Sequence, residues 1–122
     1  MISPLRNYRL CWHVNKALRL DLIRKPDLEV TDNKKRVHAH FALFTYEDEI
    51  NFVQYNFIGN KSSGIFLIPE LKEVDYLLLM RGDAAGRMKQ EVMGILKNTS
   101  GIQALFEMNP AGLRSKQNLI FE

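Results

Sequence analysis

The sequence predicts an α+β fold, in which a mixed four- to five-stranded sheet packs against two main helices. Three observations support this prediction. The chain has 122 residues, close to the usual size of one domain, and no repeat or linker divides it, so residues 1–122 are expected to form a single domain. Two segments show the three- or four-residue apolar spacing of amphipathic helices. Several short segments are rich in β-branched and aromatic residues, which favours strands.

The first helix is predicted from about Leu5 to Arg19. Pro4 suits its start, because the N–H that proline lacks would be unpaired there anyway. The apolar stripe of this helix consists of Leu10, Cys11, Val14, Ala17 and Leu18. Because Cys11 lies in this stripe, we predict a buried and unreactive thiol.

The next part of the chain predicts a hairpin. Residues 21–36 are polar and contain Pro26, which indicates an irregular connection. Residues 37–46 and 50–58 read as two strands, and the acidic residues 47–49 between them predict a short turn. The two strands should therefore pair in an antiparallel hairpin.

The second half of the chain predicts a strand, a helix and another strand. Residues 74–80 are apolar on both faces and indicate a central strand of the sheet. A helix is expected over 84–97, with Asp83 as its N-cap, and a further strand over 102–108. These elements could form a right-handed βαβ unit or an antiparallel return. The tail, 118–121, should form an edge strand or a packed terminus.

One segment carries a recognisable signature. Residues 68–76 read I-P-E-x-x-x-V-D-Y, which resembles the bacterial IPExxxVDY family at all six defined positions, Ile68, Pro69, Glu70, Val74, Asp75 and Tyr76. The stretches 8–12, 67–82 and 115–119 extend the resemblance over most of the chain. It implies a small, cytoplasmic, uncharacterised protein and brings no catalytic residues. It also implies a further strand before the equivalent of Tyr8, so we expect an open sheet edge here.

The signature has two physical interpretations. Pro69 fixes the exit from an extended segment, and Glu70 suits the start of the helical turn that follows. Asp75 enters a buried strand and needs a partner, such as a turn N–H or Arg81. The motif therefore either shapes a chain reversal and anchors the strand, or it makes Glu70, Asp75 and Tyr76 a polar cluster at a pocket.

Two further groups of residues are candidate sites. Arg81 and Asp83 mark the predicted junction of a strand end and a helix start, where α/β proteins often bind ligands. His38 and His40 are two apart on a predicted strand and so share one face. Two imidazoles can begin a metal site, but the spacing supplies no third ligand. We therefore predict solvated or hydrogen-bonded histidines, with no metal and no cofactor.

The outer side of the first helix is basic and aromatic. It carries Arg6, Tyr8, Arg9, Trp12, His13, Lys16 and Arg19. Such a face can bind RNA by stacking and phosphate contacts, or anchor a protein partner. Alternatively, its two aromatic rings can pack under the following loop while the cations stay in water.

Composition limits the function further. No apolar run reaches the ~18 residues that a membrane span needs, no signal peptide precedes the first helix, and a single cysteine suits a reducing compartment. We therefore predict a cytoplasmic protein with no membrane contact. The net charge of +3 permits an acidic partner without requiring one.

No residues form a recognisable catalytic constellation, so the leading hypothesis is a non-catalytic binding or assembly module. A homodimer that pairs through an open sheet edge is one form of it. The alternatives are an RNA-associated accessory protein that uses the first helix, and a small enzyme with a pocket near Glu70, Asp75 and Tyr76.

Overall fold

The computed structural model describes residues 1–32, 37–113 and 116–119. This part of the chain has two α-helices, α1 (Asn7–Leu18) and α2 (Ala85–Lys97). Its strands are β1 (Ile23–Asp32), β2 (Val37–Asp48), β3 (Val53–Gly59), β4 (Lys61–Ser62), β5 (Ile65–Phe66) and β6 (Tyr76–Arg81). Short 3-10 helices cover Pro69–Leu71, Pro110–Gly112 and Lys116–Leu119. No helix within these described ranges is long and apolar enough to span a membrane.

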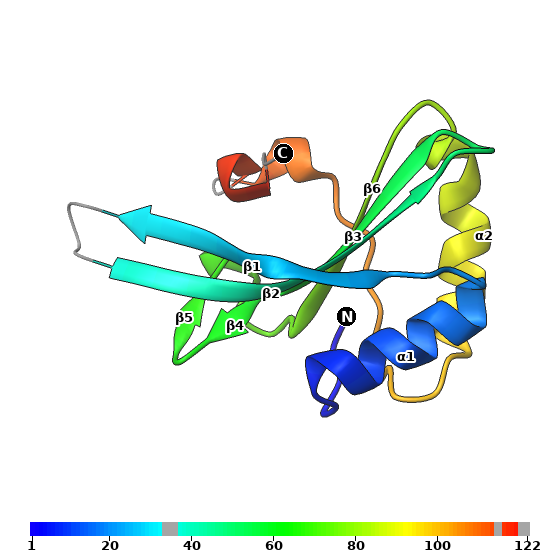
Figure 1. Ribbon diagram of the computed structural model, residues 1–122. Coiled ribbons are helices and arrows are strands. Elements are labelled where there is room, and N and C mark those ends of the chain that lie inside the picture. Colours follow the sequence, from blue (N-terminus) through cyan, green and yellow to red (C-terminus); the bar gives the residue numbers. More distant parts are fainter. Residues whose placement is uncertain (33–36, 114–115, 120–122) are drawn as a thin grey trace.

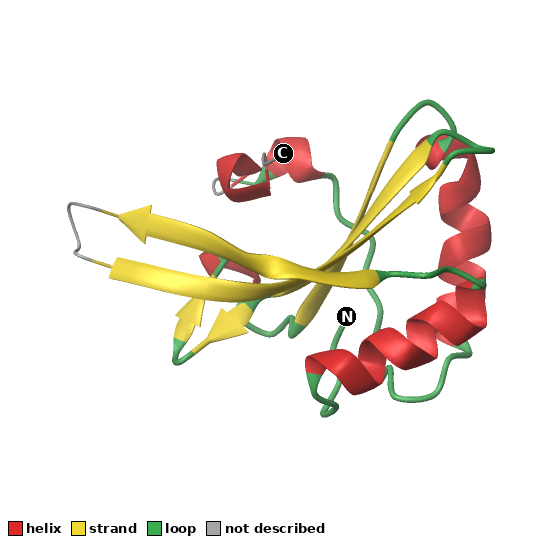
Figure 2. Cartoon of the chain, in the orientation of Figure 1, coloured by secondary structure: helices red, strands yellow, loops and turns green. Residues whose placement is uncertain are grey.

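The main sheet has the strand order β1-β2-β3-β6, and every neighbouring pair is antiparallel. Strands β4 and β5 form a separate small hairpin. The α+β fold is therefore confirmed, with a four-stranded sheet and the predicted hairpin present as β2 and β3, but the sheet is antiparallel throughout instead of mixed. Figures 1 and 2 show the two helices near one end of the sheet, while the β1–β2 ribbon extends well beyond them.

One face of the sheet packs against both helices. Leu10 and Val14 of α1 and Leu96 of α2 contribute to a core that includes Phe57 at the centre of β3. Cys11 belongs to the same core, and burial raises the pKa of its thiol to about 12. The predicted burial of Cys11 is thus confirmed, and a thiol that stays protonated is a poor nucleophile.

The opposite face of the sheet carries a second core. Phe41 of β2 and Ile58 of β3 pack there against Leu67 and Ile68, which follow the β4–β5 hairpin. Leu119 near the end of the chain is buried in the same cluster, as expected for a packed terminus. Residues 120 and 121 of the predicted tail lie outside the described residues. Because both faces are covered, most side chains in the middle of the sheet are apolar, although the polar side chain of Asn56 in β3 is buried there as well.

Asn60 joins the second core to the signature segment. Its side chain is fully buried and makes three hydrogen bonds to the backbone. Nδ2 donates to the carbonyls of Leu71 and Val74, at 2.9 Å each, and Oδ1 accepts from the N–H of Ile68 at 2.8 Å. One amide group therefore holds both ends of the turn that contains the motif.

The predicted irregular connection over residues 21–36 is wrong, because β1 occupies most of it. Pro26 is tolerated in this strand for two reasons. β1 lies at the edge of the sheet, and the pairing register with β2 shifts between Lys25 and Leu28, which marks a bulge around the proline. A proline at a bulge of an edge strand removes no ladder hydrogen bond.

The second half of the chain differs from the prediction in three ways. β6 is an edge strand whose side chains are half-buried, and the central strand is β3. Residues 102–108 form no strand, so there is no βαβ unit; they contribute one isolated bridge, between Ala104 and Ile2. Asp83 does not cap α2, because the N-cap is Ala84 and no side chain bonds to it. The apolar run over residues 74–80 therefore indicated contact with other elements of the fold, and not a central position in the sheet.

Candidate functional site

The two edges of the main sheet differ sharply in chemistry. The edge at β1 carries exposed charged side chains, including Arg24, Lys25 and Glu29, and is interrupted by Pro26. Charges, proline and a bulge are the usual means by which proteins prevent pairing at an edge strand. The edge at β6 reads Tyr-Leu-Leu-Leu-Met-Arg and has none of these features before Arg81.

The pairing of β6 with β3 decides which backbone groups of β6 face outward. The N–H and C=O groups of Tyr76 both bond to Met1, on the side away from β3. In an antiparallel ladder, residues whose backbone groups bond to the neighbouring strand alternate with residues whose backbone groups point away from it. The N–H and C=O groups of Leu78 and Met80 therefore point to the free edge. Among the described residues, no segment beyond β6 bonds to them.

Met1 occupies the first position of this free edge. Its ammonium nitrogen donates to the carbonyl of Tyr76 at 2.7 Å, and its carbonyl accepts from the N–H of Tyr76 at 3.1 Å. This reciprocal pair is antiparallel strand geometry. On the other side, Ile2 exchanges backbone hydrogen bonds with the segment at Ala104. The extended segment at Met1 and Ile2 therefore lies between β6 and the segment at Ala104, bonded to both.

An apolar groove continues from Met1 along β6. It has a volume of about 530 Å³ and is lined by residues 77–80, one side of α2 and the segment 105–109. Successive side chains of a strand point to opposite faces, so a groove that touches all of 77–80 must run along the strand edge. The unpaired backbone groups of Leu78 and Met80 thus border an apolar recess.

The amino group of Met1 lies at one end of the groove, and its surroundings change its protonation. Burial lowers the pKa of the Met1 amino group to about 6, and the nearby Asp75 carboxylate opposes part of this shift. The buried amine loses hydration that its charged form needs, so its neutral form is favoured at neutral pH. This end of the groove therefore adds little net positive charge to a lining that is mostly apolar, and whose other charged residues, Lys89 and Glu107, form an ion pair at 2.6 Å.

The polar residues of the signature make structural bonds. The Asp75 carboxylate accepts from the N–H of Ser3 at 2.9 Å and pairs with Lys61 at 2.8 Å. The Tyr76 hydroxyl donates to the carbonyl of Leu5 at 2.6 Å, and its ring stacks on Phe57. These bonds fix the N-terminal segment against the start of β6, as the chain-anchoring interpretation requires. They leave Asp75 and Tyr76 attached to different partners rather than gathered around a pocket.

The remaining residues of this region do not form an anion site. Glu70 is half-buried in the 3-10 turn after Pro69. Arg81 donates to the carbonyl of Leu119 instead of pairing with Asp75, so the suggested Arg81–Asp75 partnership is wrong. Asp83 is exposed beside it and repels negative charge.

The outer side of α1 is an exposed basic and aromatic surface. Tyr8 is 59% exposed and Trp12 is 56% exposed, so the expectation that they pack under the following loop is wrong. The Lys16 ammonium lies 4.9 Å from the centre of the Trp12 ring, and the Trp12 ring meets His13 edge-on. Four cations of this face, Arg6, Arg9, Lys16 and Arg19, are also exposed.

The two histidines lie where the β1–β2 ribbon projects from the fold. His38 and His40 are exposed, and their ring centres are 4.7 Å apart. Glu29 of β1 is the direct register partner of His40, and the two side chains approach to 3.5 Å. Sequence spacing could not find Glu29, because its proximity depends on the pairing of β1 with β2.

Comparison with known proteins gives no relative. No protein-family model, curated protein or solved structure matches the chain.

Proposed function

We propose that this protein is a cytoplasmic, non-catalytic binding module that docks an extended, apolar polypeptide strand of a partner protein against β6. The observation that carries the proposal is the apolar groove along the unpaired edge of β6. Binding of this kind is β-augmentation, in which main-chain hydrogen bonds supply affinity and flanking pockets select side chains.

The backbone geometry supports a strand rather than another kind of ligand. Leu78 and Met80 offer two N–H and two C=O groups at the spacing of a β-ladder. Met1 already pairs with Tyr76 in the same line. A partner strand placed beyond Met1 would extend this ladder over the rest of β6.

The side chains around the groove indicate the chemistry of the partner. Leu78 and Met80 belong to the core under the helices, whereas Leu77 and Leu79 belong to the core on the opposite face. A strand added at this edge would meet mostly apolar groups on both of its faces, with the Lys89–Glu107 ion pair also lining the groove. Its sequence is therefore expected to be a continuous apolar run, rich in valine, isoleucine and leucine, instead of an alternating one.

The walls of the groove favour binding of a single extended segment over pairing with the sheet of a second copy of the protein. Both α2 and the segment 105–109 border the edge of β6. In a homodimer that pairs two β6 strands, each copy would bring these same walls against the other. A single extended segment avoids this collision, so the homodimer is the competing outcome of the test.

A peptide titration tests the docking. The probe is a fluorescein-labelled peptide with six successive valine, isoleucine and leucine residues between lysine pairs, matching the six residues of β6. We expect saturable binding to the wild-type protein. The same peptide with every amide N-methylated should not bind, because it retains the side chains but loses the N–H donors.

Two glycines of α2 provide matched variants. A side chain at Gly86 or Gly94 would meet no neighbouring atoms, but only Gly86 lines the groove. Gly86→Glu should weaken peptide binding by at least about tenfold, because it places a charge in an apolar recess, while Gly94→Glu should bind as wild type does. Equal affinities in the two variants, or no binding to wild type, would contradict the proposal. A wild-type dimer that Gly86→Glu dissociates would replace it with self-association.

A second candidate function is RNA binding by the outer side of α1. The exposed rings of Tyr8 and Trp12, with Lys16 over Trp12, favour it. Anisotropy with labelled single-stranded RNA should show affinity that falls steeply between 20 and 200 mM salt and is lost in Trp12→Ala. Phe52→Ala, which removes an exposed ring elsewhere, is the control. No rise in the anisotropy of the labelled RNA at low salt would end this candidate.

The resemblance to the IPExxxVDY family remains a proposal about origin. It rests on the motif over residues 68–76 and would make this a bacterial protein. The contacts of Asp75 and Tyr76 support a structural reason for the motif, because both tie the N-terminal segment to the start of β6.

A further inference from the structure

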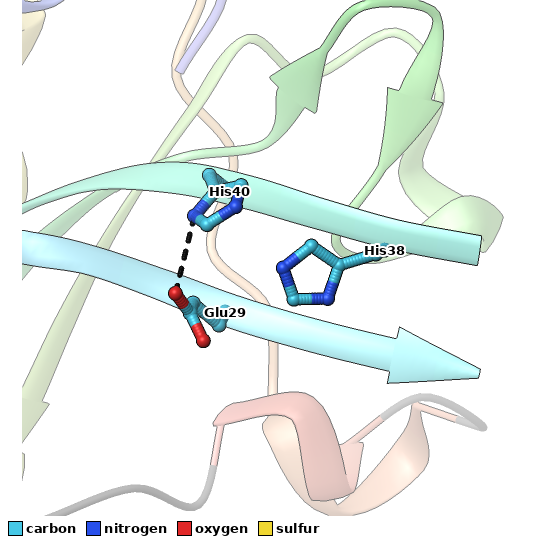
Figure 3. Close-up of side chains that lie close together, drawn as sticks. All are labelled: Glu29, His38 and His40. Carbon is cyan, nitrogen blue, oxygen red and sulfur yellow. Dashed lines mark ion pairs between the residues drawn. The ribbon is translucent and has the colours of Figure 1, made fainter. Parts of the chain in front are cut away.

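Three potential metal ligands meet on the projecting part of the β1–β2 ribbon. Glu29, His38 and His40 each place one ligand atom within 4.8 Å of the others (Figure 3). The two histidines are alternate residues of one strand, and Glu29 lies opposite His40 on the next. The strand pairing therefore holds all three on one face of the ribbon.

The ligand types and distances fit a transition metal. Imidazole nitrogens with one carboxylate oxygen suit Zn²⁺, which binds them at about 2.0–2.2 Å. In a tetrahedral site with such bonds, neighbouring ligand atoms are about 3.4 Å apart. The three side chains are exposed, so small rotations can close the gap from 4.8 Å without disturbing a core. A fourth position would remain open to water.

A neighbouring hydroxyl orients one of the ligands. Thr31 Oγ1 lies 2.8 Å from Nδ1 of His38, and Thr31 is its register partner on β1. When Nδ1 carries the proton and donates to this oxygen, Nε2 keeps its lone pair for a metal. Hydrogen bonds of this kind from the second ring nitrogen are typical of histidines that bind zinc.

We propose that Glu29, His38 and His40 bind one Zn²⁺ ion, with Thr31 as a positioning residue. The site lies on β1 and β2 and shares no residue with the groove at β6, so it is independent of strand docking. Because the ion would join the two strands across the projecting ribbon, it would stabilise their pairing at this end.

Calorimetric titration of the untagged protein with Zn²⁺ tests the site. We expect one ion per chain and affinity at least about tenfold lower in His40→Ala and in Glu29→Gln. Thr31→Val should lower affinity by about tenfold, which is typical for loss of an orienting partner. His13→Ala, on α1, should bind as tightly as wild type, because it removes the one histidine outside the cluster.

Thermal unfolding gives a second readout. Zn²⁺ that binds the folded state should raise the Tm of wild type and of His13→Ala, and should leave the Tm of His40→Ala unchanged. Glu29, Thr31 and His40 are exposed on the ribbon, so loss of folding does not obscure the effect of their replacement, and the half-buried His13 lies apart from them on α1. Equal Zn²⁺ affinity in wild type and His40→Ala, or no detectable binding to wild type, would overturn the proposal.

Discussion

Asn60→Ala is expected to lower the free energy of unfolding by about 3–5 kcal/mol, measured by urea denaturation. The Asn60 side chain is fully buried and bonds to the carbonyls of Leu71 and Val74 and to the N–H of Ile68. Alanine would leave the buried carbonyl of Val74 and the buried N–H of Ile68 without these partners, whereas the carbonyl of Leu71 would keep its bond from the N–H of Val74. Each buried group left unpaired costs about 1–3 kcal/mol. The costs are not additive, because the turn can relax once one bond is lost.

Asn98→Ala is the matched control for this prediction. Asn98 is exposed at the end of α2, and its amide donates to the carbonyl of Gly94 at 3.3 Å. The exposed carbonyl of Gly94 can bond to water instead, so the free energy of unfolding should fall by no more than about 0.5 kcal/mol. If the two variants lost similar stability, Asn60 would not be the residue that holds the signature turn.

Gly82→Ala is expected to lower the free energy of unfolding, measured by urea denaturation, by about 3 kcal/mol or more. Gly82 follows β6 with a φ of 127°, a region that residues with a Cβ rarely adopt. A Cβ at this position would also overlap the backbone carbonyl of Phe52 in the turn between β2 and β3. Backbone cannot move aside as a flexible side chain can, so either the turn or the end of β6 must shift.

Gly64→Ala separates the two contributions to that cost. Gly64 also has a positive φ, of 81°, but a Cβ there would meet no atom within 4 Å. Its replacement should lower the free energy of unfolding only through the strain of a positive φ in a residue with a Cβ, by about 1–2 kcal/mol. A Gly82→Ala variant no less stable than Gly64→Ala would show that the close approach to Phe52 does not constrain the fold.

Local patterns predicted the elements that depend on local physics. The apolar stripe through Leu10, Cys11 and Val14 placed α1 and its buried face correctly. The β-branched and aromatic runs identified β2 and β3, although two residues of the predicted acidic turn, Glu47 and Asp48, belong to β2 and the turn follows them. In both cases the residues that form the element also carry the pattern that reveals it.

Features that depend on distant pairing could not be predicted in the same way. Pro26 indicated a break, yet it lies at an edge bulge where it costs no hydrogen bond. Glu29 became a ligand candidate only through its register with His40. The run over residues 74–80 was interpreted as apolar on both faces, and this pattern cannot distinguish a central strand from an edge strand beside a mostly apolar groove.

Amide hydrogen exchange of β6, followed by NMR, tests the docking of a strand most directly. The N–H groups of Leu77 and Leu79 point to β3, whereas those of Leu78 and Met80 point to the groove. We predict slow exchange at the first two and fast exchange at the other two in the free protein, with Leu78 and Met80 slowed at least about tenfold by the apolar peptide. Leu78 and Met80 amides that exchange equally fast with and without saturating peptide would contradict strand docking at this edge.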